Sequence, residues 1–162
     1  MAQLRLRQRD AHLLYLGLLH AEAHPGLGMA GPTGERGHAE ALAPLRALLD
    51  DELDRAVVEL EVPDGALPLL GGALAAAINE LKQFAMSDGR SMVPGFAGAA
   101  RRFFPELAED PGSALDVVGH GVMLRRRLDA AVRADVPGPA PDTAPGAGRE
   151  PAPGRWSRLW RR

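Results

Sequence analysis

The chain has 162 residues, of which 46% are hydrophobic and 25% charged, with a formal net charge of −2. These values are typical of one soluble domain with a hydrophobic core, and they exclude the strongly basic surface of a general nucleic-acid-binding protein. The absence of cysteine excludes disulfides and thiolate metal sites, so any bound metal must use His, Asp or Glu. The abundance of Arg, Ala, Gly and Pro is typical of a GC-rich coding sequence and favours a bacterial origin.

Residues 3–23 are predicted to form the first helix, because leucines recur at three-to-four spacing until Pro25 stops it. The same stretch imitates a secretory signal peptide, since arginines precede an apolar run at 13–19 and an A-x-A sequence follows at 21–23. That run has only seven residues, and Asp10 interrupts the approach to it. We therefore expect a cytoplasmic protein, with export as the weaker alternative. No segment has the ~18 apolar residues of a transmembrane helix.

A loop is predicted at residues 24–37, which hold five glycines and two prolines. The second helix is predicted from about residue 39 or 44 to about residue 59. Residues 58–62 alternate like a strand, but no partner strand is evident, so we interpret them as an extended end of this helix. The apolar side of the helix is predicted to consist of Leu45, Leu48, Leu49, Leu53, Ala56, Val57 and Leu60. Acidic residues occupy the other side, where Asp51 and Arg55 are spaced as an i, i+4 ion pair.

The third predicted helix, residues 65–86, has the clearest apolar stripe, and we expect it to be the spine of the core. The stripe consists of Leu67, Leu70, Leu74, Ile78, Leu81 and, at its end, Phe84 or Ala85. Asp64 is a plausible N-cap of this helix. Glycines and alanines at 71–77 make the helix thin, so another helix can approach it closely, either within the chain or across a homodimer.

Residues 87–93 are predicted to form a turn-rich break, followed by a fourth helix at 94–104 and a short helical turn at 105–110. A fifth helix is predicted at 114–134, with Ser113 and Asp116 as its capping box. Its core residues are predicted to be Leu115, Val118, Val122, Leu124, Leu128 and Val132. The glycines on either side of His120 allow a tight helix crossing or a bend.

Basic clusters lie on the last two of these helices. They are Arg101-Arg102 and Arg125-Arg126-Arg127. Although two such clusters on adjoining faces can bind an anion, we expect them to pair with the acidic side of the second helix.

The predicted fold is therefore all-α: a compact bundle of about five helices in residues 1–135 with a disordered, Pro/Gly-rich C-terminal extension. Residues 136–154 hold six prolines and four glycines and are predicted to be a linker. Residues 155–162 form a basic Trp/Arg tail. Residues 136–162 have a net charge of +3, from five arginines and two acidic groups, whereas residues 1–135 have a net charge of −5, from 14 basic and 19 acidic groups.

The tail is the most specific functional signal in the sequence. As a helix it would place both tryptophans of the chain and one leucine on one face, surrounded by arginines. The candidate binding residues are Arg155, Trp156, Arg158, Leu159, Trp160, Arg161 and Arg162. This pattern is suited to a groove on a partner protein, an anionic membrane surface or nucleic-acid bases. The alternatives are that the tail folds back onto its own acidic domain or has no role.

A weaker signal is a histidine cluster. His20 and His24 are spaced i, i+4, which puts two imidazoles on one helical face, and Glu35 and His38 follow one loop later. Together they make a conceivable divalent-metal site. Because only one E-x-x-H pair exists, a helical di-metal site is not predicted, and scattered surface histidines are the simpler interpretation.

No motif in the sequence predicts an enzyme. Residues 26–31 match G-x-G-x-x-G, but a dinucleotide site needs a strand before the motif and a helix after it. No serine lies in a G-x-S-x-G motif. The predicted function is a non-enzymatic interaction or regulatory protein that uses its tail, without a cofactor. The alternative is a metal-binding protein or metal-dependent enzyme using the histidines around residues 24–38.

Overall fold

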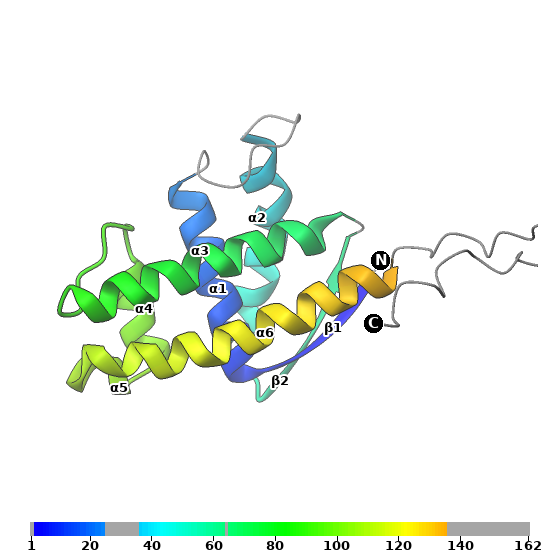
Figure 1. Cartoon of the computed structure of the whole chain (residues 1–162). Coiled ribbons are helices and arrows are strands. Elements are labelled where there is room, and N and C mark those ends of the chain that lie inside the picture. The colour runs from blue at the N-terminus through cyan, green and yellow to red at the C-terminus, as the bar shows by residue number, and fades with distance from the viewer. Residues whose placement is uncertain (1, 25–35, 64, 136–162) are drawn as a thin grey trace, which may run out of the picture.

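A computed structural model of the chain describes residues 2–24, 36–63 and 65–135, with the side chains at 36–39 and 135 left aside. These ranges contain six α-helices, one 3-10 turn and two strands, and they confirm the predicted helical bundle (Figure 1). In chain order the elements are β1 (Ala2–Arg7), α1 (Gln8–Ala23), α2 (Arg36–Glu52), β2 (Val57–Val62), α3 (Ala66–Met86), α4 (Phe96–Phe103), α5 (Glu106–Glu109), η1 (Pro111–Ser113) and α6 (Ala114–Asp135).

The prediction of helix at residues 3–7 was wrong, and so was the expectation that residues 58–62 lack a strand partner. β1 pairs with β2 in an antiparallel ladder in which Leu4 lies opposite Leu60. The helix α1 begins only at Gln8, whose backbone N–H donates to the Ala56 carbonyl at 3.0 Å. In β1 leucines alternate with arginines, which is the period of a strand, and only this short segment carries that period at the N-terminus.

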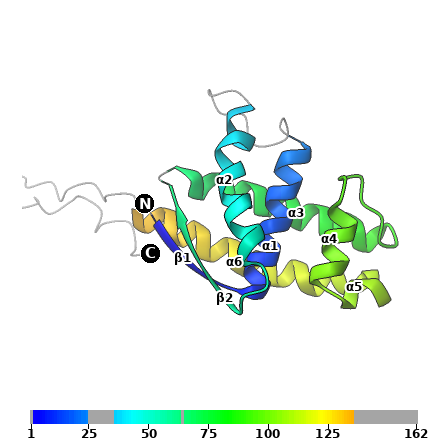
Figure 2. The same ribbon diagram turned by 180° about the vertical axis from the view of Figure 1, so that it is seen from behind.

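The helices form two layers. α3 and α6 lie side by side in one layer, and α1 and α2 cross behind them (Figure 1). From the other side α1 and α2 lie in front, and the β1–β2 ribbon curves along the C-terminal half of α6 (Figure 2). The core therefore sits between the layers, with α3 at its centre.

The predicted spine of the core is confirmed, because the α3 stripe is buried from Leu67 to Leu81; at its end Phe84 is buried and Ala85 half-buried. Glycines on the two neighbouring helices allow them to approach α3. A Cβ atom at Gly17 of α1 would lie 2.9 Å from the Ala73 carbonyl carbon, and one at Gly121 of α6 would lie 2.9 Å from Ile78 Cγ1. The predicted tight crossing at the α6 glycines is thus confirmed for Gly121.

Two predicted core faces were partly wrong. α2 ends at Glu52, seven residues earlier than expected, so Leu48 is 53% exposed and Val57 lies on the outward face of a strand. On α6, Leu115 is 58% exposed, and the inward positions are Ala114, Val117, Val118, Gly121, Leu124 and Leu128. The face of α6 that meets the core is therefore rotated relative to the predicted one.

The polar contacts at the helix ends also differ from the prediction. Asp110 rather than Ser113 caps the turn before α6: its Oδ1 accepts from the Gly112 backbone N–H at 2.8 Å, and Ser113 Oγ donates to its carbonyl. The ion pair at the end of α2 joins Arg55 to Glu52 rather than to Asp51.

The basic clusters do not pair with the acidic side of α2 as expected. Arg101 donates to the Gly89 carbonyl at 2.7 Å and stacks over the Phe84 ring. Arg125 pairs with Asp129 on its own helix, and Arg127 pairs with Asp10 at the start of α1.

Several predicted features lie outside the described residues: the linker at 136–154, the tail at 155–162, the glycine-rich motif at 26–31, Glu35 and the proposed N-cap Asp64. In the part of the chain that the structure does describe, none of the helices combines the length and the apolar character needed to cross a membrane.

Candidate binding groove

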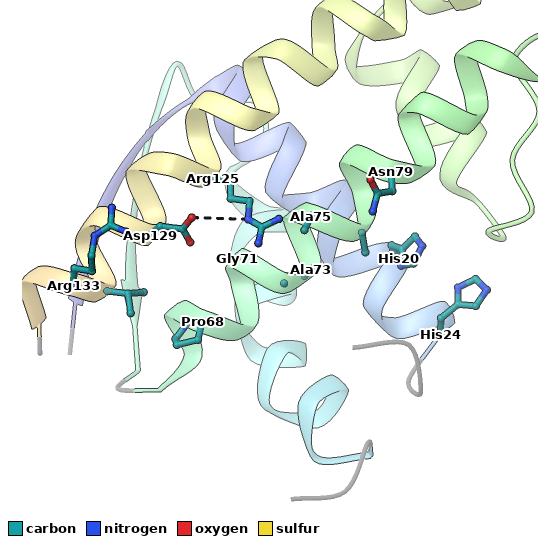
Figure 3. A pocket seen from close by; sticks show the side chains of 13 residues that line it. His20, His24, Pro68, Gly71, Ala73, Ala75, Asn79, Arg125, Asp129 and Arg133 are labelled. Atoms are coloured by element: carbon teal, nitrogen blue, oxygen red, sulfur yellow. Dashed lines mark ion pairs between the residues drawn. The ribbon is translucent and has the colours of Figure 1, made fainter. Parts of the chain in front are cut away.

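A groove of about 590 Å³ lies across the small-residue face of α3. Its floor is formed by Gly71, Gly72, Ala75 and Ala76, and its walls come from the last turn of α1 and the C-terminal half of α6 (Figure 3). The other lining residues are His20, His24, Pro68, Ala73, Asn79, Arg125, Asp129, Val132 and Arg133. Three helices that are distant in sequence thus converge on one depression.

The depth of this groove follows from the small side chains of α3. Apart from its chain neighbours and the nearby backbone of α3, no described atom lies within 4 Å of a Cβ placed at Gly72, and a Cβ at Gly71 would meet only Asp129 Oδ1, at 3.7 Å. The tight helix crossings involve other positions of α3: Gly17 of α1 lies against Ala73, and Gly121 of α6 lies against Ile78. The close approach expected at the small residues 71–77 is made by α1 at Ala73, but none of the described helices covers the outer part of this segment, where Ala75 and Ala76 are half-buried.

The walls of the groove give it a local basic character. Arg125 and Arg133, both exposed, lie on one wall, and Asp129 is the single acidic residue among those that line it. Arg125 Nε lies 4.0 Å from Asp129 Oδ2, with both side chains about half exposed, so solvent weakens this pair. Because residues 1–135 have a net charge of −5, the groove is a basic site on an acidic domain.

The opposite wall carries His20 and His24, two of the four predicted metal ligands. Their rings stack with centroids 5.0 Å apart and planes at 29°. His24 Nδ1 is buried and has no hydrogen-bond partner among the described residues. Burial lowers the pKa of His20 below its usual value, the charge of His24 adds to this effect, and Glu80 opposes it. The neutral form of His20, which is the form that binds metals, is therefore favoured.

The other two predicted ligands are not placed: Glu35 and the side chain of His38 fall outside the described residues. Within the ranges that are described, no group of three or more His, Cys, Asp or Glu side chains is arranged to hold a metal ion. The structure thus brings together one half of the predicted site.

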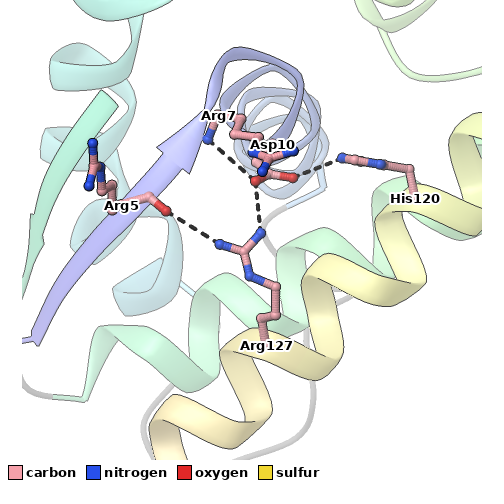
Figure 4. A network of polar contacts seen from close by, with 5 residues as sticks. All are labelled: Arg5, Arg7, Asp10, His120 and Arg127. Atoms are coloured by element: carbon pink, nitrogen blue, oxygen red, sulfur yellow. Dashed lines mark hydrogen bonds and ion pairs between the residues drawn. The ribbon is translucent and has the colours of Figure 1, made fainter. Parts of the chain in front are cut away.

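A second polar site, which the sequence interpretation missed, surrounds Asp10. This carboxylate is 2% exposed. Its Oδ1 lies 2.8 Å from His120 Nε2, and its Oδ2 accepts from Arg127 Nη1 at 2.9 Å and from the Arg7 backbone N–H at 3.4 Å (Figure 4). Arg127 also donates to the Arg5 carbonyl at 3.3 Å. The signal in the sequence was a single acidic residue in the first turn of α1, shortly before the apolar run at 13–19.

These contacts decide the charge of Asp10. Burial alone would raise its pKa, but hydrogen bonds from Arg127, His120 and the Arg7 backbone outweigh burial, so the pKa of Asp10 is lowered. The ionised carboxylate joins β1, α1 and α6 at one point.

An Asp–His pair also occurs in nucleophilic catalysis, where a hydroxyl must reach the imidazole. The hydroxyls of Ser87, Ser91 and Ser113 donate elsewhere, to backbone carbonyls or to Glu80. Among the described residues no serine therefore completes a triad with Asp10 and His120. The geometry indicates a structural role, in which Asp10, His120 and Arg127 hold α1 and α6 together; we call these three residues the Asp10 clamp.

Comparison with known proteins gives no relative: no protein-family model, no curated protein and no solved structure matches this chain.

Proposed function

We propose that this protein is a non-enzymatic interaction protein that binds an amphipathic helix of a partner protein in the groove on α3. The observation that carries the proposal is the groove itself, whose floor of glycine and alanine is covered by none of the described residues. A floor without large side chains lets the backbone of a second helix come close, so that the partner's larger apolar side chains supply the packing.

Charge selects the kind of partner. With Arg125 and Arg133 exposed on the wall and only Asp129 opposing them, the groove favours a helix whose apolar stripe is bordered by Glu or Asp. Exposed charges of this kind mainly determine specificity and association rate, while apolar contact with the floor supplies most of the affinity.

The basic Trp/Arg tail is proposed as a second contact with the target. Because a linker of 19 residues joins domain and tail, the second binding event is intramolecular, which raises the overall affinity if both sites fit one target. The tail's target can be the same partner protein, an anionic membrane surface or nucleic acid. This second contact is supported by the separation of charge in the sequence, with a basic tail joined to an acidic domain.

The groove is tested with the full-length protein and two labelled synthetic helical peptides. Both peptides carry leucines at i, i+3, i+4 and i+7, bordered by Glu in one and by Lys in the other, and binding is followed by fluorescence anisotropy. We expect the Glu peptide to bind more tightly than the Lys peptide, and the substitutions Gly72→Leu and Arg125→Glu each to weaken it about tenfold, or ~1.4 kcal/mol.

A matched control is Gly98→Leu, which adds the same side chain at an exposed glycine of α4 that also has open space around it. Binding should be unchanged in this variant. Equal binding of the Glu peptide to wild type and to Gly72→Leu would show that the groove is not the binding site.

Metal binding is the second candidate function, and the stacked His20–His24 pair favours it. We propose that these imidazoles form part of a divalent-cation site that Glu35 and His38 would complete. Isothermal titration of full-length protein with Zn²⁺ should show binding that is lost in His20→Ala and retained in His120→Ala. No heat of binding in the wild type, or equal binding in both variants, would eliminate this candidate.

A further inference from the structure

A second depression, of about 530 Å³, lies where the C-terminal half of α2 meets the outward side of β2. Apart from Arg5 and Arg55, its exposed and half-buried residues make what we name the acidic face. They are Leu48, Asp51, Glu52, Val57, Glu59 and Glu61. In β2 exposed and buried residues alternate, so Val57, Glu59 and Glu61 point outward while Val58, Leu60 and Val62 enter the core.

This face has an excess of negative charge. Two arginines border it: Arg55 pairs with Glu52 at 2.7 Å, and Arg5 lies 4.0 Å from Glu59, with both side chains of that second pair about 80% exposed. Among the described residues neither Asp51 nor Glu61 has an ion-pair partner, and Asp50 and Asp54 are exposed beside them.

Apolar surface lies within the same face. Leu48 is 53% exposed and Val57 is 40% exposed. Apolar side chains bordered by unpaired carboxylates provide a surface for a segment that combines apolar and cationic side chains.

We propose that the acidic face is the docking site of this chain's own tail, residues 155–162, and that docking keeps the tail from its external target. The tail supplies both required chemistries: two tryptophans and a leucine for the apolar residues, and four arginines with no acidic residue for the carboxylates. The basic groove on α3 is a poorer site for it, because Arg125 and Arg133 would repel the tail.

The chain is long enough to make this contact. Arg127 of α6 donates to the Arg5 carbonyl, and Arg5 lies opposite Glu59 in the strand ladder, so α6 passes close to the acidic face. From Arg127 the helix continues for eight residues, about 12 Å, to its end at Asp135. A 19-residue linker with the dimensions of a coil would span roughly 25 Å.

This inference rests on that part of the proposed function in which the tail binds an external target. It adds a way in which that binding is regulated. A docked tail is unavailable to membranes, nucleic acid or partners, and a target must compete with the acidic face to release it. Since the contact is largely between exposed charges, it weakens as salt rises.

Intrinsic fluorescence of the full-length protein tests the proposal directly, because Trp156 and Trp160 are the only tryptophans. At low salt we expect tryptophan emission at shorter wavelength than in the urea-unfolded protein. This blue shift should be lost in about 1 M NaCl, where the Debye length is ~3 Å, and in the double variant Asp51→Lys/Glu61→Lys. The matched control Glu109→Lys/Asp116→Lys, which reverses two exposed carboxylates on α5 and α6, should keep the blue shift.

Circular dichroism confirms that each variant is folded, and a dilution series separates docking within one chain from docking between two. A blue shift that persists on dilution supports the proposal, whereas one that disappears on dilution assigns the contact to a second copy and overturns it. Emission like that of unfolded protein at low salt overturns it as well. So does a blue shift that survives the Asp51→Lys/Glu61→Lys exchange but is lost in Gly72→Leu, because the tail would then occupy the groove. None of these outcomes depends on the peptide measurements, so the two proposals fail separately.

Discussion

The Asp10 carboxylate and the His120 imidazole join the start of α1 to α6: Asp10 Oδ1 lies 2.8 Å from His120 Nε2, although 110 residues separate them. Arg127 contacts the other oxygen of the same carboxylate and the β1 backbone. One buried anion thus fixes how β1, α1 and α6 meet, and the groove wall formed by α6 depends on that arrangement.

We predict that Asp10→Ala lowers the free energy of unfolding by about 2 kcal/mol, because it leaves the Arg7 N–H, His120 and Arg127 without their shared acceptor. The half-exposed side chains of His120 and Arg127 keep the loss below that of a fully buried ion pair. Urea denaturation followed by circular dichroism measures the change. Asp116→Ala, at an exposed carboxylate of α6, should stay within about 0.5 kcal/mol of wild type. Equal free energies of unfolding for the two variants would contradict a stabilising role of the Asp10 clamp.

Asp10 also predicts a stability change in acid. Its hydrogen bonds lower its pKa in the folded state below the usual value of 3.8, so the unfolded chain takes up the proton first. The stabilisation by the carboxylate is therefore complete above pH 3.8 and is lost as the pH falls through the lower folded value. Asp10→Asn should remove this part of the pH dependence. Parallel curves of unfolding free energy against pH for wild type and variant would show that Asp10 does not cause this part of the pH dependence.

Protonation of His12 should cause a second change in stability, at higher pH. Burial lowers its pKa below 6.5, with Arg102 and Arg9 adding to the effect, while the Leu53 carbonyl and Asp54 oppose it. The fold prefers neutral His12, so its contribution is complete above pH 6.5 and decreases as the pH falls below that value. His20, whose pKa is also lowered, contributes in the same direction.

The measurement for His12 compares chemical denaturation of wild type and His12→Gln from about pH 7.5 to about pH 5. Glutamine can keep the hydrogen bond that His12 Nε2 makes to the Leu53 carbonyl at 3.1 Å, but it does not titrate. A flatter pH profile in the variant is expected, and an unchanged profile would assign the acid sensitivity to other groups.

Two glycine substitutions should act in opposite directions. Gly17→Ala brings a methyl group to 2.9 Å from the backbone of Ala73, so we expect it to destabilise the protein by about 1–3 kcal/mol. Gly72→Ala meets no described atom within 4 Å, and should stabilise α3 by up to ~1 kcal/mol through helix propensity. Thermal and urea unfolding of both variants provide the comparison, and a gain in stability for Gly17→Ala would show that α1 and α3 do not cross there.

Substitutions on the two sides of β1 can show that residues 3–7 form a strand rather than the helix expected from the sequence. Leu6 is 1% exposed, whereas the Arg5 side chain is 78% exposed and pairs with Glu59 across the strands. Leu6→Ala should cost about 2–5 kcal/mol. Arg5→Ala, measured in the same denaturation series, should change stability by less than about 1 kcal/mol. Similar losses of stability in the two variants would show that Leu6 does not point into the core while Arg5 points outward.

Local pattern determined a large part of this fold. Each helix is specified by apolar residues that are neighbours along the chain, and the α3 stripe is buried from Leu67 to Leu81 as that periodicity requires. The need for glycine at one close crossing was also visible in the sequence around His120. The predicted bundle in residues 1–135 follows from such short-range information.

The tertiary structure decided what depends on residues far apart in the chain. β1 is a strand because β2 offers its edge, and six residues at the N-terminus carry too short a pattern to predict that pairing. Likewise, only the packing of α6 against α1 and α3 shows that Arg127 and His120 serve Asp10, or that Leu115 faces outward. The groove has the same origin: the sequence shows small residues on α3, but only the positions of α1 and α6 leave their outer face uncovered.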